Sequence, residues 1–313
     1  MKIVVPEKIA PSGVDLLRAA GFTVVTLAPA SQASGELARE IADAEGLIVR
    51  SAVKVTAELI AAAPRLRVVG RAGVGVDNVD VAAASARSIV VMNTPGGSSI
   101  AVAELTMAMI LALARQLPRA DASTRAGQWE KKSLEGVELH GKTLGLVGCG
   151  RIARAVAVRA RAFDMHVLGC DPVASPDATA AGIEVVDIDR VLDQSDYLSL
   201  HVSLTPQSHN LLNAAALAKI KPGVRIINCS RGEVVDEDAL QQALLSGRVA
   251  GAALDVFHRE PPGALPLFAL PNVIATPHIG ASTYEAQERV GVAIAVQLRD
   301  FLLHGTLANA VNA

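Results

Sequence analysis

The chain has 313 residues, enough for two domains of ordinary size, and 51% of them are apolar, so a large core can be buried. The net charge of −2 and the lack of a basic run argue against nucleic acid or a membrane as partner. The N-terminus has no signal-peptide pattern and the three cysteines have no zinc spacing, so we expect a cytoplasmic protein without a metal site.

The first part of the chain alternates short apolar strands with helices. This pattern is typical of a parallel sheet with helices on both faces. The expected strands are Lys2–Val5, Thr23–Thr26, Gly46–Val49, Arg67–Gly70 and Ile89–Met92. The expected helices are Pro11–Ala20, Gly35–Ala44, Thr56–Ala62 and Val79–Ala86.

A turn-rich segment, 93–99, precedes a long apolar helix at Ala101–Ala114 and a second series of alternating elements. The strands expected there are Thr143–Val147, His166–Gly169, Ile183–Val186, Tyr197–Val202, Val224–Asn228, Gly251–Val256 and Val273–Ala275. The expected helices are Ile152–Phe163, Ile188–Gln194, Asp236–Leu245 and a last helix from Ser282 to about His304.

These elements predict an α/β fold with two doubly wound parallel-sheet domains. A flavodoxin-like substrate domain is expected at 1–96 plus 284–313, and a Rossmann dinucleotide-binding domain at 97–283.

The clearest motif follows the strand Thr143–Val147. It has the form G-x-G-x-x-A, opens a helix, and is followed by a strand that ends at Asp171. Gly148 permits a tight turn, and Gly150 lets the backbone approach a pyrophosphate at the N-terminus of the helix. Asp171 would bind a ribose hydroxyl and repel a 2′-phosphate. The motif therefore predicts an NAD site.

Three charged side chains follow predicted strands of the second domain: Arg231, Glu260 and His278. Because ligands bind at the carboxyl ends of parallel strands, we expect these side chains to converge. A histidine suits proton transfer near neutral pH, a carboxylate can orient it, and an arginine can hold a carboxylate. Each of the three taken alone could equally be a structural residue.

Several motifs together give the chain a family resemblance. They are Gly70-Arg-Ala-Gly73-Val-Gly75, Asn93-Thr-Pro, Gly148-Cys-Gly150-Arg-Ile, Asn228-Cys-Ser-Arg231-Gly, Ala253-Leu-Asp255-Val-Phe and Pro277-His278-Ile-Gly-Ala-Ser. With these the chain resembles the D-isomer-specific 2-hydroxyacid dehydrogenases over essentially its whole length. The resemblance implies that Arg231, Glu260 and His278 form the catalytic set.

The resemblance also implies NAD as cofactor. Besides the two fingerprint glycines and Asp171, it assigns cofactor contacts to Val74, Arg151, Ile152, His201, Val202, Cys229, Ser230, Arg231, Asp255, His278, Gly280 and Ala281. Ala153 stands where many relatives have glycine, a change of one methyl group that we expect to be tolerated.

Substrate binding is predicted in the first domain. Backbone N–H groups of the Gly73-Val74-Gly75 turn could hold a carboxylate. Arg50, Lys54 and Arg71 would supply positive charge for a phosphate, and the resemblance supports this role for Arg50 and Lys54. Lys54 could also be a solvated surface residue.

The resemblance therefore implies NAD-dependent oxidation of 3-phospho-D-glycerate to 3-phosphohydroxypyruvate, with Arg231 and His278 also contacting the substrate. A dehydrogenase of another D-2-hydroxy acid, such as glycerate or lactate, an NAD-sensing binding protein and a purely structural protein remain alternatives. The helix Ala101–Ala114 could form a homodimer contact or be a core helix. Longer relatives carry a regulatory domain, and feedback control through one is not expected here.

Overall fold

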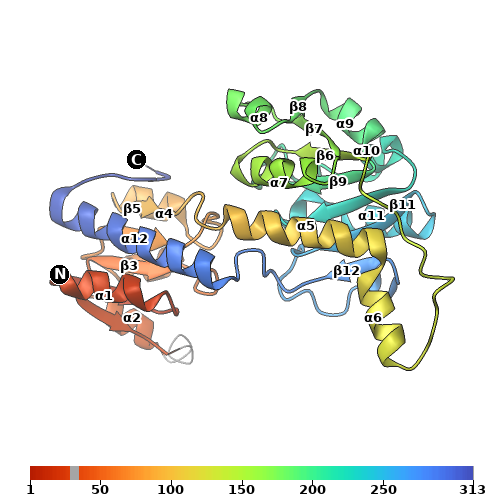
Figure 1. Ribbon diagram of the computed structural model, residues 1–313. Helices are drawn as coiled ribbons and strands as arrows, with labels where there is room; N and C mark the ends of the chain where they lie inside the picture. Colours follow the sequence, from red (N-terminus) through yellow and green to blue (C-terminus); the bar gives the residue numbers. More distant parts are fainter. Residues whose placement is uncertain (29–34, 313) are drawn as a thin grey trace. The chain divides into compact units, whose positions relative to one another are not determined.

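The computed structural model describes residues 1–28 and 35–312. The chain forms two compact units, Met1–Ser98 with Ser282–Ala313, and Ser99–Ala281 (Figure 1). The prediction placed the domain boundaries at 96/97 and 283/284, within two residues of the points at which the chain passes from one unit to the other. Each unit is described here by itself.

The first unit contains a parallel sheet of order β2-β1-β3-β4-β5, which is the flavodoxin-like order. Its strands are β1 (Lys2–Val5), β2 (Thr23–Thr26), β3 (Gly46–Val49), β4 (Val68–Arg71) and β5 (Val90–Met92). Its helices are α1 (Pro11–Ala19), α2 (Glu36–Ile41), α3 (Ala57–Ala61), α4 (Val81–Ala86) and α12 (Tyr284–His304). Strands β1 and β3 are almost entirely buried, as expected for a sheet covered on both faces.

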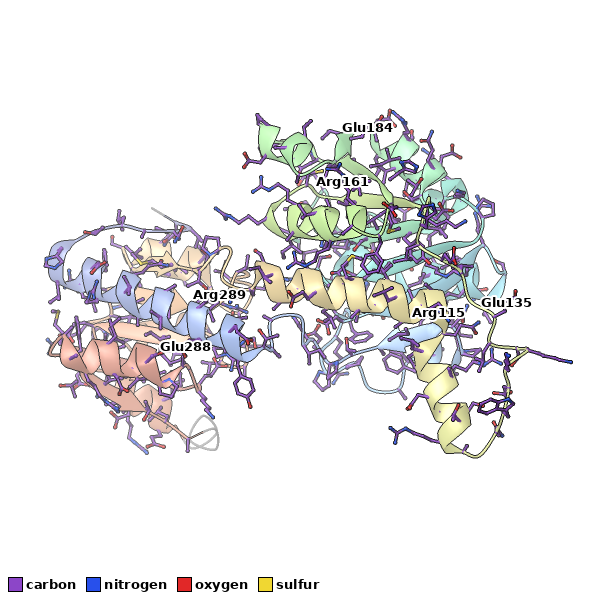
Figure 2. All side chains as sticks on the ribbon, viewed as in Figure 1. Arg115, Glu135, Arg161, Glu184, Glu288 and Arg289 are labelled. Carbon is purple, nitrogen blue, oxygen red and sulfur yellow. The ribbon has the colours of Figure 1, made fainter. Side chains whose placement is uncertain are left out.

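Helices α1 and α12 pack closely because two glycines meet at their contact (Figure 1). A Cβ added at Gly13 would lie 2.6 Å from the carbonyl oxygen of Gly291, and one added at Gly291 would lie 2.8 Å from the Cβ of Ala10. Figure 2 labels Glu288 and Arg289 near the start of α12; Glu288 accepts a hydrogen bond from Ser12, and Arg289 donates one to the carbonyl of Gly97. The last helix is therefore an integral part of the first unit.

The second unit contains a seven-stranded parallel sheet of order β12-β11-β10-β9-β6-β7-β8. Counted from β6, this is the 3-2-1-4-5-6 order of a Rossmann fold with a seventh strand added. The strands are β6 (Thr143–Val147), β7 (His166–Cys170), β8 (Glu184–Val185), β9 (Tyr197–Leu200), β10 (Val224–Asn228), β11 (Val249–Leu254) and β12 (Val273–Ala275). The prediction of two parallel α/β domains is confirmed.

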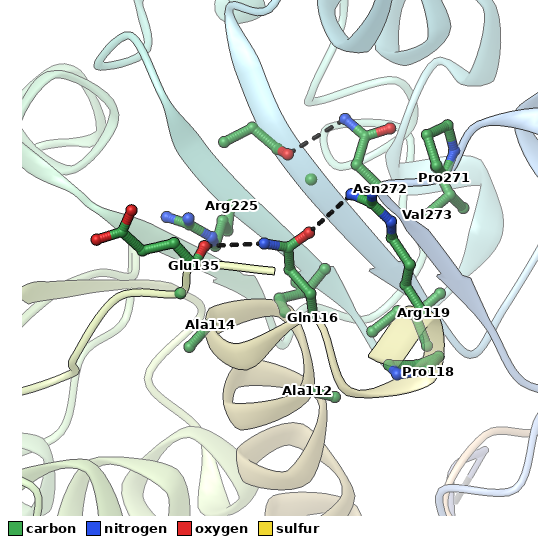
Figure 3. A pocket seen from close by; sticks show the side chains of 15 residues that line it. Ala112, Ala114, Gln116, Pro118, Arg119, Glu135, Arg225, Pro271, Asn272 and Val273 are labelled. Atoms are coloured by element: carbon green, nitrogen blue, oxygen red, sulfur yellow. Dashed lines mark hydrogen bonds between the residues drawn. The ribbon is translucent and has the colours of Figure 1, made fainter. Parts of the chain in front are cut away.

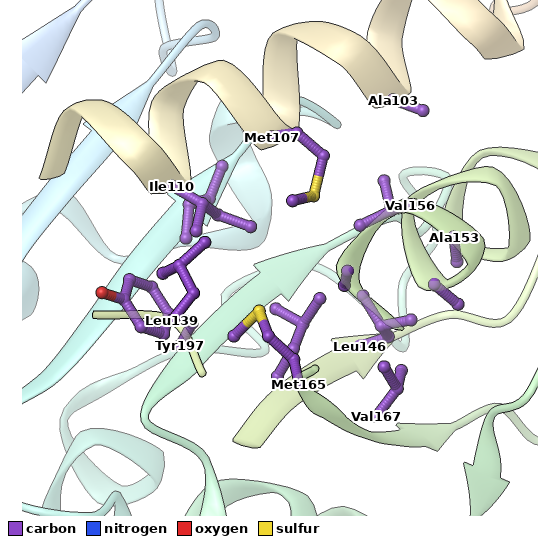
Figure 4. Close-up of a cluster of buried hydrophobic side chains, with 14 of the residues drawn as sticks. Ala103, Met107, Ile110, Leu139, Leu146, Ala153, Val156, Met165, Val167 and Tyr197 are labelled. Carbon is purple, nitrogen blue, oxygen red and sulfur yellow. The ribbon is translucent and has the colours of Figure 1, made fainter. Parts of the chain in front are cut away.

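The helices of the second unit cover this sheet. They are α5 (Ser99–Arg115), α6 (Leu117–Arg125), α7 (Arg151–Arg161), α8 (Pro176–Ala180), α9 (Ile188–Gln194), α10 (Ala214–Lys219) and α11 (Glu237–Leu245), with short 3-10 turns at Gly232–Val234 and Pro266–Ala269. On one face, Met107 and Ile110 of α5 share a core with Val156 of α7, Leu146 of β6 and Tyr197 of β9 (Figure 4). The apolar helix that the sequence predicted at Ala101–Ala114 is thus largely buried within its own unit.

Helices α6, α8 and α10 are not predicted from the sequence, and two of the expected strands are two residues too long. Helices α8 and α10 have only 5 and 6 residues, and α6 contains few apolar residues, so hydrophobic periodicity could not reveal them. Strand β9 ends at Leu200 rather than at Val202, and β8 is limited to Glu184–Val185.

Within the described residues, no single helix is long and apolar enough to cross a membrane; the bent pair of α5 and α6, at 63°, meets the requirement by length and composition only.

Candidate active site

The glycine-rich turn lies between β6 and α7. Gly148 has a φ of 90°, and a Cβ at this position would lie 2.6 Å from the carbonyl oxygen of His201. Glycine is therefore required here both by the backbone conformation and by the neighbouring strand. Ala153 on the first turn of α7 is completely buried, which explains why a small residue occupies the third motif position.

Gly150 is the N-cap of α7, and its surroundings are open. Among the described residues other than its chain neighbours, none has an atom within 4 Å of a Cβ added there, and no side chain caps the helix. The N–H groups of the first turn, which begins at Arg151 and Ile152, are thus available to an anion together with the positive end of the helix dipole. This open cradle fits a pyrophosphate.

Asp171 directly follows β7 and is fixed by two backbone donors. Its Oδ2 accepts a hydrogen bond of 2.8 Å from Cys149 N, and its Oδ1 accepts one of 2.9 Å from Val173 N. Each carboxylate oxygen keeps a second lone pair for another donor. The acidic residue is thereby held beside the glycine turn with acceptor capacity suited to a ribose diol.

His201 follows β9 and lies against the same turn. Its Nε2 is 3.0 Å from the hydroxyl of Ser199, and its Nδ1 is inaccessible to solvent with no partner among the described residues. Although the residue as a whole is only partly buried, its imidazole ring is enclosed by the protein. This burial lowers the pKa of His201 to about 4. The ring is therefore neutral at physiological pH. The adjacent Val202 packs against the core.

Asn228 shapes the turn that carries Arg231. Its Oδ1 accepts hydrogen bonds from N (3.0 Å) and Oγ (2.7 Å) of Ser230, and its Nδ2 donates to the carbonyl of Arg231 at 2.8 Å. Between them, Cys229 points toward α5, with its sulfur 3.6 Å from that of Met109, and burial raises the pKa of its thiol to about 12. The side chain of Cys229 is therefore protonated and packs against α5.

The structure brings His278 and Glu260 together. Nδ1 of His278 lies 2.7 Å from Oε2 of Glu260, and Oε1 of Glu260 accepts a bond of 3.3 Å from Phe257 N. The two side chains are 46% and 39% exposed, which leaves the rest of the imidazole ring accessible to a small molecule. The other ring nitrogen, Nε2, is the atom available for proton transfer.

Asp255 fixes the loop that carries His278. This aspartate residue is 1% exposed. Its Oδ1 accepts hydrogen bonds from Oγ1 of Thr276 at 2.5 Å and from Ile279 N at 2.8 Å, and its Oδ2 accepts one from Gly280 N at 2.8 Å. The sequence predicts Asp255 only as a cofactor contact, whereas the structure shows that it anchors residues 276–280.

Strand register explains why these residues share one edge. Asn228 of β10 pairs with Leu254 of β11, which pairs with Ala275 of β12. The three strands therefore end side by side, and Arg231, Asp255 and His278 follow those ends. The turn Gly148–Gly150 and Asp171 follow the ends of β6 and β7 in the same parallel sheet.

The predicted substrate residues lie at the carboxyl edge of the first unit's sheet. Val49 of β3 pairs with Arg71 of β4, so the loops Arg50–Lys54 and Gly73–Gly75 leave adjacent strands. The second loop is fixed through its carbonyls: Thr94 N and Oγ1 donate to Gly73 O, at 2.9 and 3.2 Å, and Asn93 Nδ2 donates to Val74 O at 2.6 Å.

A pocket of about 230 Å³ in the second unit lies at the amino ends of the strands of its sheet (Figure 3). Arg225 and Val273, which are near the beginnings of β10 and β12, line it together with Gln116 and Arg119. It is therefore remote from the carboxyl edge, and no candidate catalytic residue lines it. In the described part of the chain, no cluster of three or more His, Cys, Asp or Glu residues could hold a metal ion.

The sheet order and the open glycine turn together define a dinucleotide-binding protein of the Rossmann class. The model for the D-isomer specific 2-hydroxyacid dehydrogenase, NAD binding domain, matches residues 107–280. The whole chain is 49% identical over 313 residues to a human protein named D-3-phosphoglycerate dehydrogenase, of which the match covers 58%. The chain thus spans little more than half the length of this relative.

Solved structures with the same fold cover almost the whole of this chain. A protein of Thermus thermophilus superimposes with a TM-score of 0.90 at 37% identity, covering 99% of this chain and 100% of the other. An NAD-dependent formate dehydrogenase from Staphylococcus aureus, solved in complex with NAD, superimposes with a TM-score of 0.87 at 30% identity. The match covers 100% of this chain and 99% of the other. The chain belongs to the D-isomer specific 2-hydroxyacid dehydrogenase family, and its second unit is an NAD-binding domain.

Proposed function

We propose that this protein oxidises 3-phospho-D-glycerate to 3-phosphohydroxypyruvate with NAD, the reaction that begins L-serine biosynthesis. The observation that carries this proposal is the 2.7 Å contact between His278 and Glu260 at the carboxyl edge of an NAD-binding sheet. It is supported by relatives at 44–49% identity that bear the name D-3-phosphoglycerate dehydrogenase.

The residues at the carboxyl edge fit NAD. The open turn at Gly148–Gly150 and the first turn of α7 would hold the pyrophosphate, and Asp171 the adenosine ribose. When bound, NAD supplies the acceptor for the hydride that leaves C2 of the substrate. The further residues that we assign to the cofactor are Val74, Arg151, Ile152, His201, Val202, Cys229, Ser230, Arg231, Asp255, His278, Gly280 and Ala281.

His278 acts as the general base. Glu260 accepts a hydrogen bond from the protonated Nδ1, so the lone pair of the imidazole lies on Nε2. Nε2 takes the proton of the 2-hydroxyl group as C2 becomes a carbonyl carbon, and it later releases this proton to solvent. Asp255 keeps the loop of His278 in place during this exchange.

Arg231 binds the substrate and polarises the reacting oxygen. A planar guanidinium can donate two parallel hydrogen bonds to a carboxylate, which orients the substrate, and it stabilises negative charge on the 2-oxygen. The tight Asn228 turn fixes the backbone from which this side chain extends.

In the first unit, we assign Arg50 and Lys54 to the substrate phosphate, with Arg71 adding positive charge, and the Gly73-Val74-Gly75 turn to the substrate carboxylate. Both loops leave the same edge of the sheet, and Thr94 and Asn93 hold the second by its carbonyl groups. The phosphate assignment is what separates this function from that of a dehydrogenase acting on glycerate, glyoxylate or lactate.

A substrate panel tests the proposal. NADH formation from 3-phosphoglycerate should exceed that from glycerate, lactate and 2-hydroxyglutarate in kcat/KM, and Lys54→Ala should lower kcat/KM only for the phosphorylated acid. The matched control is Lys219→Ala, an exposed lysine on α10 that pairs with Asp189. If the wild-type protein prefers an unphosphorylated acid, that acid is the substrate and 3-phosphoglycerate is not. If it binds NADH but oxidises none of the acids, it is an NAD-sensing protein instead.

We also propose a cytoplasmic homodimer. Three free cysteines with thiols kept protonated by burial suit a reducing compartment. The exposed side chains of Leu117 and Trp129, on and after α6, offer apolar area to a second copy. Neither nucleic acid nor a membrane is expected as a partner. Sedimentation of the purified protein tests the dimer.

A further inference from the structure

Glu7 makes an unusual set of contacts in the first unit. It lies just after β1, half-buried, and its carboxylate accepts hydrogen bonds from three backbone N–H groups of another loop. Oε2 accepts from Arg50 N at 2.7 Å and from Val53 N at 3.2 Å, and Oε1 accepts from Ala52 N at 2.9 Å. One side chain thus fixes the backbone over the segment that contains Arg50.

The pairing of β1 with β3 makes these contacts possible. Ile3 pairs with Gly46 and Val4 with Leu47, so the segments that follow the two strands leave the same edge of the sheet. Glu7 and Arg50 are 43 residues apart in the chain but adjacent there.

Asn78 holds the same loop through its carbonyl groups. Its side-chain Nδ2 donates to Arg50 O at 2.9 Å and to Val53 O at 2.7 Å. Its main-chain carbonyl accepts a hydrogen bond from Val55 N at 2.8 Å. Glu7 binds three of the backbone donors of residues 50–53 and Asn78 binds two of their acceptors, so the backbone of the loop is held at both of its ends.

The charged side chains of the loop remain available. The guanidinium of Arg50 donates to the carbonyl of Lys8 at 3.3 Å, and in the described part of the chain neither Arg50 nor Lys54 pairs with a carboxylate. The negative charge of Glu7 is directed at main-chain N–H groups rather than at these two cations. Both cations can therefore meet an incoming anion from a fixed backbone.

We propose that Glu7 is a positioning residue for the substrate phosphate: its carboxylate holds the loop that presents Arg50 and Lys54. This rests on the proposed function of the protein. The carboxylate is needed, because glutamine offers one acceptor oxygen, and its amide N–H₂ group would face a backbone donor. A preformed loop binds the phosphate more tightly, because less conformational entropy is lost on binding.

The variant Glu7→Gln tests the proposal by steady-state kinetics. Loss of charge-assisted bonds to this loop should raise KM for 3-phosphoglycerate about 10-fold or more. We expect kcat, the affinity for NADH and kcat/KM for D-glycerate to stay within about twofold, since the catalytic loops lie in the other unit. The matched control is Glu36→Gln, a partly exposed carboxylate at the start of α2, which should leave every parameter unchanged.

Two further readouts separate positioning from loss of structure. Hydrogen exchange at the amides of Arg50, Ala52 and Val53 should accelerate in Glu7→Gln, while the central strand β3 keeps its protection. Glu7→Asp, which retains both oxygens on a shorter side chain, should recover part of the KM effect.

Each outcome is decisive. If the wild-type protein does not oxidise 3-phosphoglycerate, the proposed function fails, and this proposal fails with it. If the wild-type protein is active and Glu7→Gln leaves KM unchanged, only the role of Glu7 is overturned. A uniform loss of activity toward all substrates, with lost protection in β3, would also overturn it, because it would show a general structural role.

Discussion

Nδ1 of His278 and Oε2 of Glu260 lie 2.7 Å apart, although the two residues are 18 positions apart in the chain. His278 follows β12, which is at the edge of the sheet, and Glu260 follows β11, the next strand. The contact leaves Nε2 as the accessible ring nitrogen, and the chemistry that we propose depends on it.

Replacing His278 by alanine should lower kcat by about 10²–10⁴, the usual contribution of general acid–base catalysis. Glu260→Gln should give a smaller loss, because the base remains but its orientation is weakened. Steady-state kinetics with saturating NAD measure both. His140→Ala removes an exposed histidine that also pairs with an aspartate, and it should have no effect. Turnover of His278→Ala within threefold of wild type would remove this residue from the mechanism.

Replacing Asp255 by asparagine should destabilise the protein and lower kcat together. The amide cannot accept from all three donors, and leaving a buried donor unsatisfied costs about 1–3 kcal/mol. Urea unfolding and kcat measure the two effects, with Asp121→Asn, an exposed partner of Arg125, as control. Normal kcat in a destabilised Asp255→Asn protein would show that the anchor supports folding but not the orientation of His278.

Asp171→Ala should weaken the binding of NADH and so reduce the preference of the protein for NADH over NADPH. The carboxylate supplies acceptors for the ribose hydroxyls and repels a 2′-phosphate, so its removal should change the preference for NADH over NADPH by about tenfold or more. Fluorescence titration with both reduced cofactors gives the ratio. Asp189→Ala, at an exposed ion pair on α9, is the matched control. An unchanged ratio would place the ribose elsewhere.

The stability of the protein should decrease as the pH falls through the acidic range, in part because of His201. Burial lowers its pKa in the folded state from 6.5 to about 4. Its contribution to stability is therefore fully present above pH 6.5 and is lost as the pH falls toward 4, where the unfolded state binds the extra proton. Urea midpoints at pH 7 and pH 4.5 should differ less in His201→Gln than in wild type. The exposed His166→Gln should retain the wild-type difference; equal differences in all three proteins would contradict a buried, neutral His201.

The fold was predictable in large part because its signals are local. Alternating apolar strands and helices predicted both sheets, and Asp236, at the predicted start of a helix, caps α11 by accepting from Ala239 N. Asn213 caps α10 with its side chain, and Pro176 is the first residue of α8, so the sequence contains start signals for both helices. Both helices are too short to show a helical repeat of apolar residues. Helix α6 follows Gln116, whose φ of 50° redirects the chain; no side-chain pattern indicates such a turn at glutamine.

By itself the sequence predicted which residues could do the chemistry: a glycine suited to a tight turn at 148, a carboxylate at 171, and an imidazole, a guanidinium and a carboxylate after successive strands. These properties belong to single residues and their immediate neighbours. The sequence also led us to expect Glu260 and His278 to converge, and the tertiary structure gave their direct contact. Only the tertiary structure decided that Asp255 anchors the loop 276–280 and that Glu7 holds the backbone at Arg50. Such contacts join residues 18 to 43 positions apart, and they form because parallel pairing brings the ends of separate strands to one edge.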